Sequence, residues 1–262
     1  MRKVFIDCEL QYFATASSDF VFNIQAAHHE WQDIMEEKLT FKPDSSATFG
    51  LGHTGQNRLL RLSDIVNSFS IRYQGTVNVN YPSPTGFEPE VKIANLPLDV
   101  IPYIWSSRYC ESDAILKLTN DLFGRLPSGY CRVEAICQWI RDNIKYQPGI
   151  TNSVTSSRNV LDGGIGVCRD FAHLGISFCR ALNIPARFVT GYAHFAEPPN
   201  DFHAIFEAYL GNRWILFDPT VMSPVEELVR TATGRDASDT AFSTIFGPVV
   251  MNYMNPQVIV SE

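Results

Sequence analysis

The stretch GGIGVCRDFAHL, from Gly163 to Leu174, places one cysteine between a glycine-rich loop and the first turn of a predicted helix. Glycines let the backbone turn tightly and leave space beside the cysteine side chain. The N-terminus of a helix favours negative charge, because its first N–H groups lack partners and its peptide dipoles are aligned. A thiol acts as a nucleophile in its thiolate form. The stretch therefore predicts that Cys168 is a nucleophile.

Two motifs further along the chain contain the residue types that activate a nucleophile. His203 lies in the run DFHAIFEAYL, and Asp218 lies in the run WILFDPT. A histidine can accept the proton of the nucleophile, and an aspartate can orient that histidine. The order of the three residues predicts a catalytic set of Cys168, His203 and Asp218. The backbone N–H of Cys168 is one candidate donor to an oxyanion, and the sequence does not identify a second donor.

The pair Gly211-Asn212 separates two strand-like runs and is typical of a two-residue hairpin turn. Such a turn places Leu210 opposite Arg213. If the same register continues, His203 lies opposite Thr220.

Side chains alternate between the two faces of a sheet, so this register places His203, Ile205 and Asp218 on one face. His203 and Asp218 become diagonal neighbours on adjacent strands, roughly 7 Å apart. We expect the helix that begins at Cys168 to pack on that same face.

The pattern of apolar residues divides the chain into two parts. Alternating residues such as Val4, Ile6, Cys8 and Leu10 predict strands in the first eighty residues and a β-sandwich-like domain over residues 1–90. A proline-rich connector follows, and then helical patterns give way to strands again. The sequence predicts an α+β fold, with residues 91–262 as the catalytic domain.

Composition and charge exclude several classes of protein. The 262 residues are 45% hydrophobic and 19% charged, with a formal net charge of −7, which argues against disorder and against a nucleic-acid partner. No apolar run is long enough for a membrane helix, and the first residues do not resemble a signal peptide. We expect a cytoplasmic protein with no membrane partner. Homo-oligomer formation is left open.

Metal and cofactor sites are not indicated. None of the six cysteines forms a Cys-x-x-Cys pair, and no acidic or cysteine cluster accompanies His28 and His29. We expect no metal and no cofactor.

Several other polar residues near these motifs are predicted to be structural. His173 lies five positions after Cys168, so the helix turns it away from the cysteine. Asp170 suits the dipole of the first helical turn. Arg235, Asp236 and Asp239 are expected to form an ion network that closes the C-terminal segment.

The motifs GVCRDFAHL, IPARFVTGY, DFHAIFEAYL and FDPT resemble, in order and spacing, those of the transglutaminase-like superfamily of cysteine acyl-transfer enzymes. They are most similar to its bacterial transglutaminase-like cysteine protease subgroup. The block GRDASDTAF and the β-rich N-terminal segment also resemble this subgroup. Ile205 stands where the family usually has tryptophan.

This resemblance implies a papain-like core with Cys168 as nucleophile, His203 as base and Asp218 as the residue that orients the base. It implies hydrolysis of an amide, peptide or isopeptide bond in a peptide or protein substrate, through a thioester. Two alternatives stay open: transfer of the acyl group to an amine, and a non-catalytic binding or scaffold module that keeps the fold.

Overall fold

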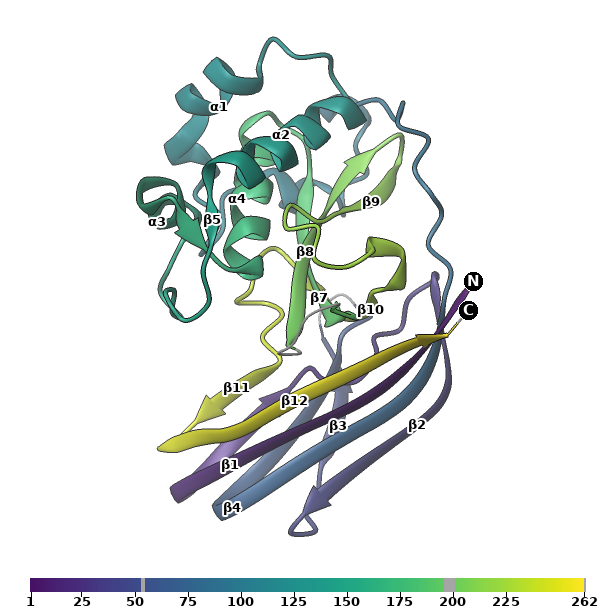
Figure 1. Cartoon of the computed structure of the whole chain (residues 1–262), viewed down its shortest axis with the longest axis vertical. Coiled ribbons are helices and arrows are strands. Elements are labelled where there is room, and N and C mark those ends of the chain that lie inside the picture. The colour runs from purple at the N-terminus through teal and green to yellow at the C-terminus, as the bar shows by residue number, and fades with distance from the viewer. Residues whose placement is uncertain (53–54, 196–200, 262) are drawn as a thin grey trace.

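The computed structural model describes residues 1–52, 55–195 and 201–261. An antiparallel sheet of long strands lies at one end of the molecule, and the helices lie at the other end around a second sheet (Figure 1). The α+β class predicted from the sequence is confirmed. No helix in the described ranges is long and apolar enough to cross a membrane.

The first sheet is built around two strands of more than twenty residues, which pair antiparallel along most of their length. Its six strands are β1 (Arg2–Phe22), β2 (Gln32–Lys42), β3 (Thr48–Leu51), β4 (Arg58–Val79), β11 (Ser243–Phe246) and β12 (Val249–Ser261). The strands β2 and β3 pair with different parts of β4, and β11 and β12 pair with different parts of β1.

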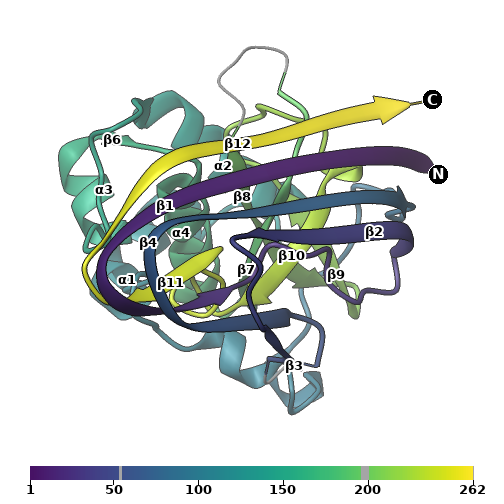
Figure 2. The same ribbon diagram turned by 90° about the horizontal axis from the view of Figure 1, so that it is seen from below.

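Both long strands bend near their middle. The register of β1 against β4 shifts between Ala14 and Ser18, and in β4 Asp64 and Asn67 have φ angles of 59° and 66°. The sheet therefore curves back over itself (Figure 2). Side chains on its concave face pack together, with the Tyr12 and Phe20 rings 5.2 Å apart. The sequence pattern predicted a β-sandwich-like domain in this part of the chain. In the structure, one long sheet bends so that its two halves form the two layers.

The end of the chain belongs to this first sheet. β12 follows β1 over residues 3–14, and β11 pairs with residues 19–22. The sequence-based division into residues 1–90 and 91–262 groups these two strands with the catalytic part. In the structure their hydrogen-bonded neighbour is the first strand of the chain.

A connector without regular strands leads from β4 to the helices. Its short 3-10 helices are η1 (Ile93–Asn95), η2 (Ile101–Ile104) and η3 (Ser112–Ile115), and a fourth, η4 (Val225–Glu227), comes later. The α-helices are α1 (Leu116–Phe123), α2 (Tyr130–Asn143), α3 (Ser157–Gly163) and α4 (Cys168–Ala181).

The second sheet has the strand order β10-β7-β8-β9. Its strands are β7 (Ala186–Tyr192), β8 (Phe202–Leu210), β9 (Arg213–Phe217) and β10 (Val229–Gly234). The helix α4 packs against the face of β8 that carries Ala204, Phe206 and Ala208. The packing is close, since a Cβ added at Gly175 would lie 2.6 Å from the Phe206 ring.

The expectation that α4 packs on the face of His203 and Ile205 is therefore wrong. Ile205 lies on the opposite face, in a small core with Val189 and Leu228. The reason is that the apolar stripe of α4 fits the small and aromatic side chains Ala204, Ala208 and Phe206, while only the first turn of the helix approaches His203.

Candidate active site

Cys168 is the first residue of α4, and the loop before it is fixed by Asp170. One carboxylate oxygen of Asp170 accepts the backbone N–H of Val167 at 3.0 Å, and Asp170 is fully buried. Gly166 is required beside it, because a Cβ there would lie 2.9 Å from the Cβ of Asp170. Arg169 pairs with the other oxygen of Asp170 at 3.0 Å. The predicted structural role of Asp170 is confirmed, and the role is to cap the helix that presents the cysteine.

The predicted hairpin and its register are confirmed. Leu210 lies opposite Arg213, and the ladder continues to Phe206 opposite Phe217. The turn residues Gly211 and Asn212 have φ angles of 55° and 62°, as a type I′ turn requires. This register brings the start of β8 and the residue after β9 next to each other.

At that point His203 and Asp218 form a direct hydrogen bond. The Nε2 of His203 lies 2.8 Å from the Oδ2 of Asp218. Their side chains are only 1% and 3% exposed, so water screens the pair weakly. The ladder of β8 with β9 stops at Phe217, yet the diagonal pairing predicted for His203 and Asp218 is present.

Thr220 fixes the second oxygen of Asp218. The backbone N–H and the hydroxyl of Thr220 both donate to Oδ1 of Asp218, at 2.8 and 2.7 Å. Oδ2 is left for the imidazole. The hairpin register predicted Thr220 to lie opposite His203. In the structure, its two hydrogen bonds to Asp218 hold the carboxylate in a single orientation.

The charges of this pair stabilise one another. Burial alone would lower the pKa of His203, but the hydrogen bond with Asp218 and the neighbouring Cys168 raise it to about 10. Burial would raise the pKa of Asp218, yet the hydrogen bonds from His203 and Thr220 hold it below its ordinary value. The pair is therefore an imidazolium and a carboxylate at neutral pH.

The half-buried Cys168 thiol is close enough to the same imidazole to contribute to its raised pKa. Because Nε2 of His203 is occupied by Asp218, the ring nitrogen available to the thiol is Nδ1. That nitrogen is buried and has no hydrogen-bond partner in the described part of the chain, so it is free to take the proton of the thiol. The structure thus brings the three residues singled out from the sequence to one place.

Tyr146 is a further residue at this place, and the sequence reasoning missed it. Burial raises the pKa of its hydroxyl well above the ordinary range, and the neighbouring Cys168 contributes to the shift. Its ring also contacts Phe171, with the centroids 5.8 Å apart.

A two-stranded parallel sheet positions Tyr146. The strand β5 (Lys145–Tyr146) pairs with β6 (Ile165–Gly166), just before the cysteine helix. The Lys145 N–H donates to the carbonyl of Gly164 at 2.8 Å, and the Gln147 N–H donates to the carbonyl of Gly166 at 2.9 Å. A strand of two residues has no periodic pattern, so the sequence offered no signal for this pairing.

His173 packs in the core, as predicted. Its ring lies between those of Tyr109 and Phe188, with centroid distances of 5.1 and 4.7 Å. Its Nε2 accepts the backbone N–H of Ala237 at 3.1 Å. Burial lowers the pKa of His173 to about 3, so it is neutral.

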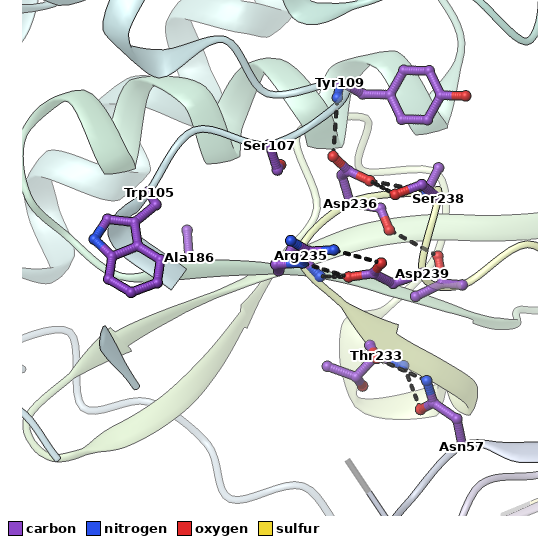
Figure 3. A network of polar contacts seen from close by, with 12 residues as sticks. Asn57, Trp105, Ser107, Tyr109, Ala186, Thr233, Arg235, Asp236, Ser238 and Asp239 are labelled. Atoms are coloured by element: carbon purple, nitrogen blue, oxygen red, sulfur yellow. Dashed lines mark hydrogen bonds and ion pairs between the residues drawn. The ribbon is translucent and has the colours of Figure 1, made fainter. Parts of the chain in front are cut away.

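Arg235, Asp236 and Asp239 hold the segment after β10 (Figure 3), where Arg235 and Asp239 form an ion pair and the backbone N–H of Asp239 donates to the carbonyl of Asp236 at 3.1 Å. Arg235 makes a two-pronged ion pair with Asp239, at 2.9 and 3.1 Å. Asp236 instead accepts the backbone N–H of Tyr109 at 2.9 Å and the N–H and hydroxyl of Ser238. These contacts fasten the segment to the connector and lie apart from the Cys168 contacts.

No group of three or more histidine, cysteine, aspartate or glutamate side chains is arranged to hold a metal within residues 1–52, 55–195 and 201–261.

Comparison with known proteins agrees with this architecture. Residues 2–99 match the family described as bacterial transglutaminase, N-terminal domain, and residues 117–219 match the transglutaminase-like superfamily. A solved structure from Cytophaga hutchinsonii, described as a "putative cysteine protease", is 40% identical with a TM-score of 0.95. That similarity covers 100% of this chain and 91% of the other.

Two further relatives are more limited. The uncharacterized protein ML0607 of Mycobacterium leprae is 35% identical over 120 residues, which is 42% of this chain and 42% of that protein. The periplasmic domain of TgpA from Pseudomonas aeruginosa is 15% identical, with a TM-score of 0.42 over 80% of this chain and 91% of the other.

The two family matches and the full-length similarity to the Cytophaga protein identify this chain as a member of the transglutaminase-like superfamily that carries the bacterial transglutaminase N-terminal domain.

Proposed function

We propose that this protein is a cysteine-dependent acyl-transfer enzyme that hydrolyses an amide, peptide or isopeptide bond through a thioester. The observation that carries the proposal is the buried 2.8 Å contact of His203 with Asp218, next to a thiol at a helix N-terminus. It is the arrangement that a nucleophile, its base and the orienting group of that base require.

In the first step, Nδ1 of His203 holds the proton of the Cys168 thiol, and the sulfur attacks the substrate carbonyl carbon. The carboxylate of Asp218 accepts a hydrogen bond from Nε2–H of His203 and stabilises the imidazolium that results. The imidazolium then gives its proton to the leaving amine as the carbon–nitrogen bond breaks. A thioester between the acyl group and Cys168 remains.

The tetrahedral intermediate carries negative charge on the former carbonyl oxygen. The backbone N–H of Cys168 and the hydroxyl of Tyr146 are neighbours, and both can donate to that oxygen. We assign Tyr146 as the second oxyanion donor, which the sequence left unidentified. Its hydroxyl is protonated at neutral pH, as in any tyrosine, and the raised pKa keeps it so as the pH increases.

In the second step, His203 takes a proton from water, and the resulting hydroxide attacks the thioester and releases the acid and free Cys168. An amine that replaces this water would give the transfer reaction of a transglutaminase. We place hydrolysis first because water is always present. The proposed substrate is a peptide or protein, and the cytoplasmic location stays a prediction.

The test is alkylation of the native protein by iodoacetamide from pH 4 to 9, with the labelled cysteines identified by mass spectrometry. Cys131 is exposed, whereas Cys168 is half-buried. Cys131 is therefore the more accessible thiol, and its labelling rate is the internal reference against which that of Cys168 is compared. The proposal expects Cys168 to react faster than Cys131, also well below the free-thiol pKa of about 8.5. The His203→Ala substitution should remove this advantage.

Equal or slower labelling of Cys168 at every pH would contradict the proposal and favour a non-catalytic module. Mass analysis after incubation with an activated ester separates the reactions further. An acyl adduct confined to Cys168, lost with time in water, supports hydrolysis.

A further inference from the structure

A cleft of about 740 Å³ lies where the two sheets and the connector meet. Its walls are formed by the loop before β4, by the connector between Asp99 and Tyr103, by β7 and β9, and by the segment after β10. Cavities of about 300–1,000 Å³ are typical of sites for small molecules. The cleft is therefore large enough for a ligand that touches both parts of the chain.

The cleft is separate from the proposed reaction centre. Arg187 lines it near the start of β7, whereas His203 pairs with Gly191 near the other end of that strand. Four positions along a strand span about 13 Å. The buried side chains of Val189 and Ile205 fill the face of the sheet in between. Of the described residues that line the cleft, none belongs to the candidate active site.

Arg187 brings a positive charge to the cleft that its own ion pair does not balance. Its Nε donates to Oε2 of Glu207 at 2.6 Å. Arg230 already donates to both oxygens of the same carboxylate, so two guanidinium groups share one glutamate. The two terminal amino groups of Arg187 donate no hydrogen bond within the described part of the chain, and its side chain is only 11% exposed.

Two aromatic rings fix the orientation of the Arg187 guanidinium. Its central carbon lies 4.1 Å from the ring centroid of Trp214 and 5.9 Å from that of Tyr103. The two rings contact each other edge to face, with their centroids 5.3 Å apart. A guanidinium held in this way presents its terminal amino groups as a planar fork, which matches the two oxygens of a carboxylate.

The acidic residues of the cleft indicate a second charge on the ligand. Asp239 is occupied, because Arg235 donates to both of its oxygens. Asp99 is exposed, and no ion pair joins it to a lysine, arginine or histidine of residues 1–52, 55–195 and 201–261. A ligand with only negative charge would be repelled by Asp99, whereas an ammonium group would be attracted to it.

We propose that this cleft is a second ligand site, which binds a free α-amino acid with an apolar side chain. The carboxylate of the amino acid pairs with the terminal amino groups of Arg187, and its ammonium group lies toward Asp99. Its side chain packs against Trp214 and the connector residues Val100 and Pro102, which also line the cleft. Binding at this site requires no reaction at Cys168.

Isothermal titration calorimetry with three probes tests the site. The probes are L-phenylalanine, L-phenylalaninamide, which lacks the carboxylate, and 3-phenylpropionate, which lacks the ammonium group. At about pH 6 the amines are protonated. L-Phenylalanine should bind, and each of the other two should bind about tenfold more weakly, because each loses one hydrogen bond between charged groups. Prior alkylation of Cys168 should leave the Kd unchanged.

Two variants assign the two charges. Arg187→Gln should remove the advantage of L-phenylalanine over its amide, and it should fold because Glu207 keeps its bonds to Arg230. Asp99→Asn should remove the advantage over 3-phenylpropionate and keep the advantage over the amide. Arg72→Gln is the control: it removes one positive charge from an ion pair on the first sheet and should leave all three affinities unchanged.

Four results would overturn the inference: no binding of L-phenylalanine to the wild type, equal affinity for its amide, full affinity in Arg187→Gln, or loss of binding after alkylation of Cys168. The last result would place the probe in the active site instead of the cleft. If Arg187→Gln does not fold, the three probes on the wild type and on Asp99→Asn still decide.

Discussion

Replacement of Asp218 by asparagine removes the carboxylate charge and also changes which ring nitrogen of His203 carries the proton. In the wild type, the N–H and hydroxyl of Thr220 both donate to Oδ1 of Asp218. In Asp218→Asn the same two donors select the amide oxygen for that position. The amide NH₂ group must then face Nε2 of His203, which has to accept and so loses its hydrogen. The remaining proton moves to Nδ1, the nitrogen that should accept the proton of Cys168.

The expected decrease in the rate of Cys168 alkylation follows from the charged hydrogen bond between His203 and Asp218 that is lost. A hydrogen bond between charged partners contributes about 1.5–3 kcal/mol, and the burial of both side chains favours the upper end of this range. About 3 kcal/mol corresponds to a rate about a hundredfold lower. We therefore expect alkylation of Cys168 at pH 6–7 to slow by about that factor in Asp218→Asn.

The assay is the rate of iodoacetamide labelling at Cys168, followed by mass spectrometry, with Asp33→Asn as a control for the loss of one charge. Thermal melting of each variant establishes that it is folded. A rate within a factor of about three of the wild type, with an unchanged pH profile, would refute the proposed role of Asp218 and the effect of Thr220 on it.

Three further predictions concern stability and pH. Gly175→Ala should lower the free energy of unfolding by about 1–3 kcal/mol, measured by urea denaturation, because the new methyl group overlaps the Phe206 ring; an unchanged unfolding midpoint would contradict the close packing. Glu207→Gln should cost about 3–5 kcal/mol in the same assay, since it leaves the buried Arg230 guanidinium without its counter-charge. The raised pKa of His203, about 10, predicts stabilisation that is complete below about pH 6.5 and is lost as pH rises through 10. Melting temperatures measured between pH 6 and 10.5 should show this loss of stability in the wild type. If the melting temperature of His203→Gln fell with pH in parallel with that of the wild type, the loss could not come from His203.

Local patterns in the sequence determined much of the candidate site. The turn pair Gly211-Asn212 fixes the register of β8 against β9, because side chains alternate along each strand and a slip of one residue would reverse both faces. The cysteine at a helix start follows from the glycines before it and the capping carboxylate of Asp170. Such rules act over a few residues, so they can be read from the chain itself.

Tertiary structure determined the features of the fold and of the candidate site that local sequence patterns did not predict. Which face of β8 the helix α4 covers depends on the fit of Gly175 against Phe206, and strand alternation cannot rank two apolar faces. β12 joins β1 across almost the whole chain, and Tyr146 is brought to Cys168 by a two-residue parallel pairing. These contacts join segments distant in sequence and gain their energy from packing and backbone hydrogen bonds formed only in the folded chain, so no short stretch of sequence determines them.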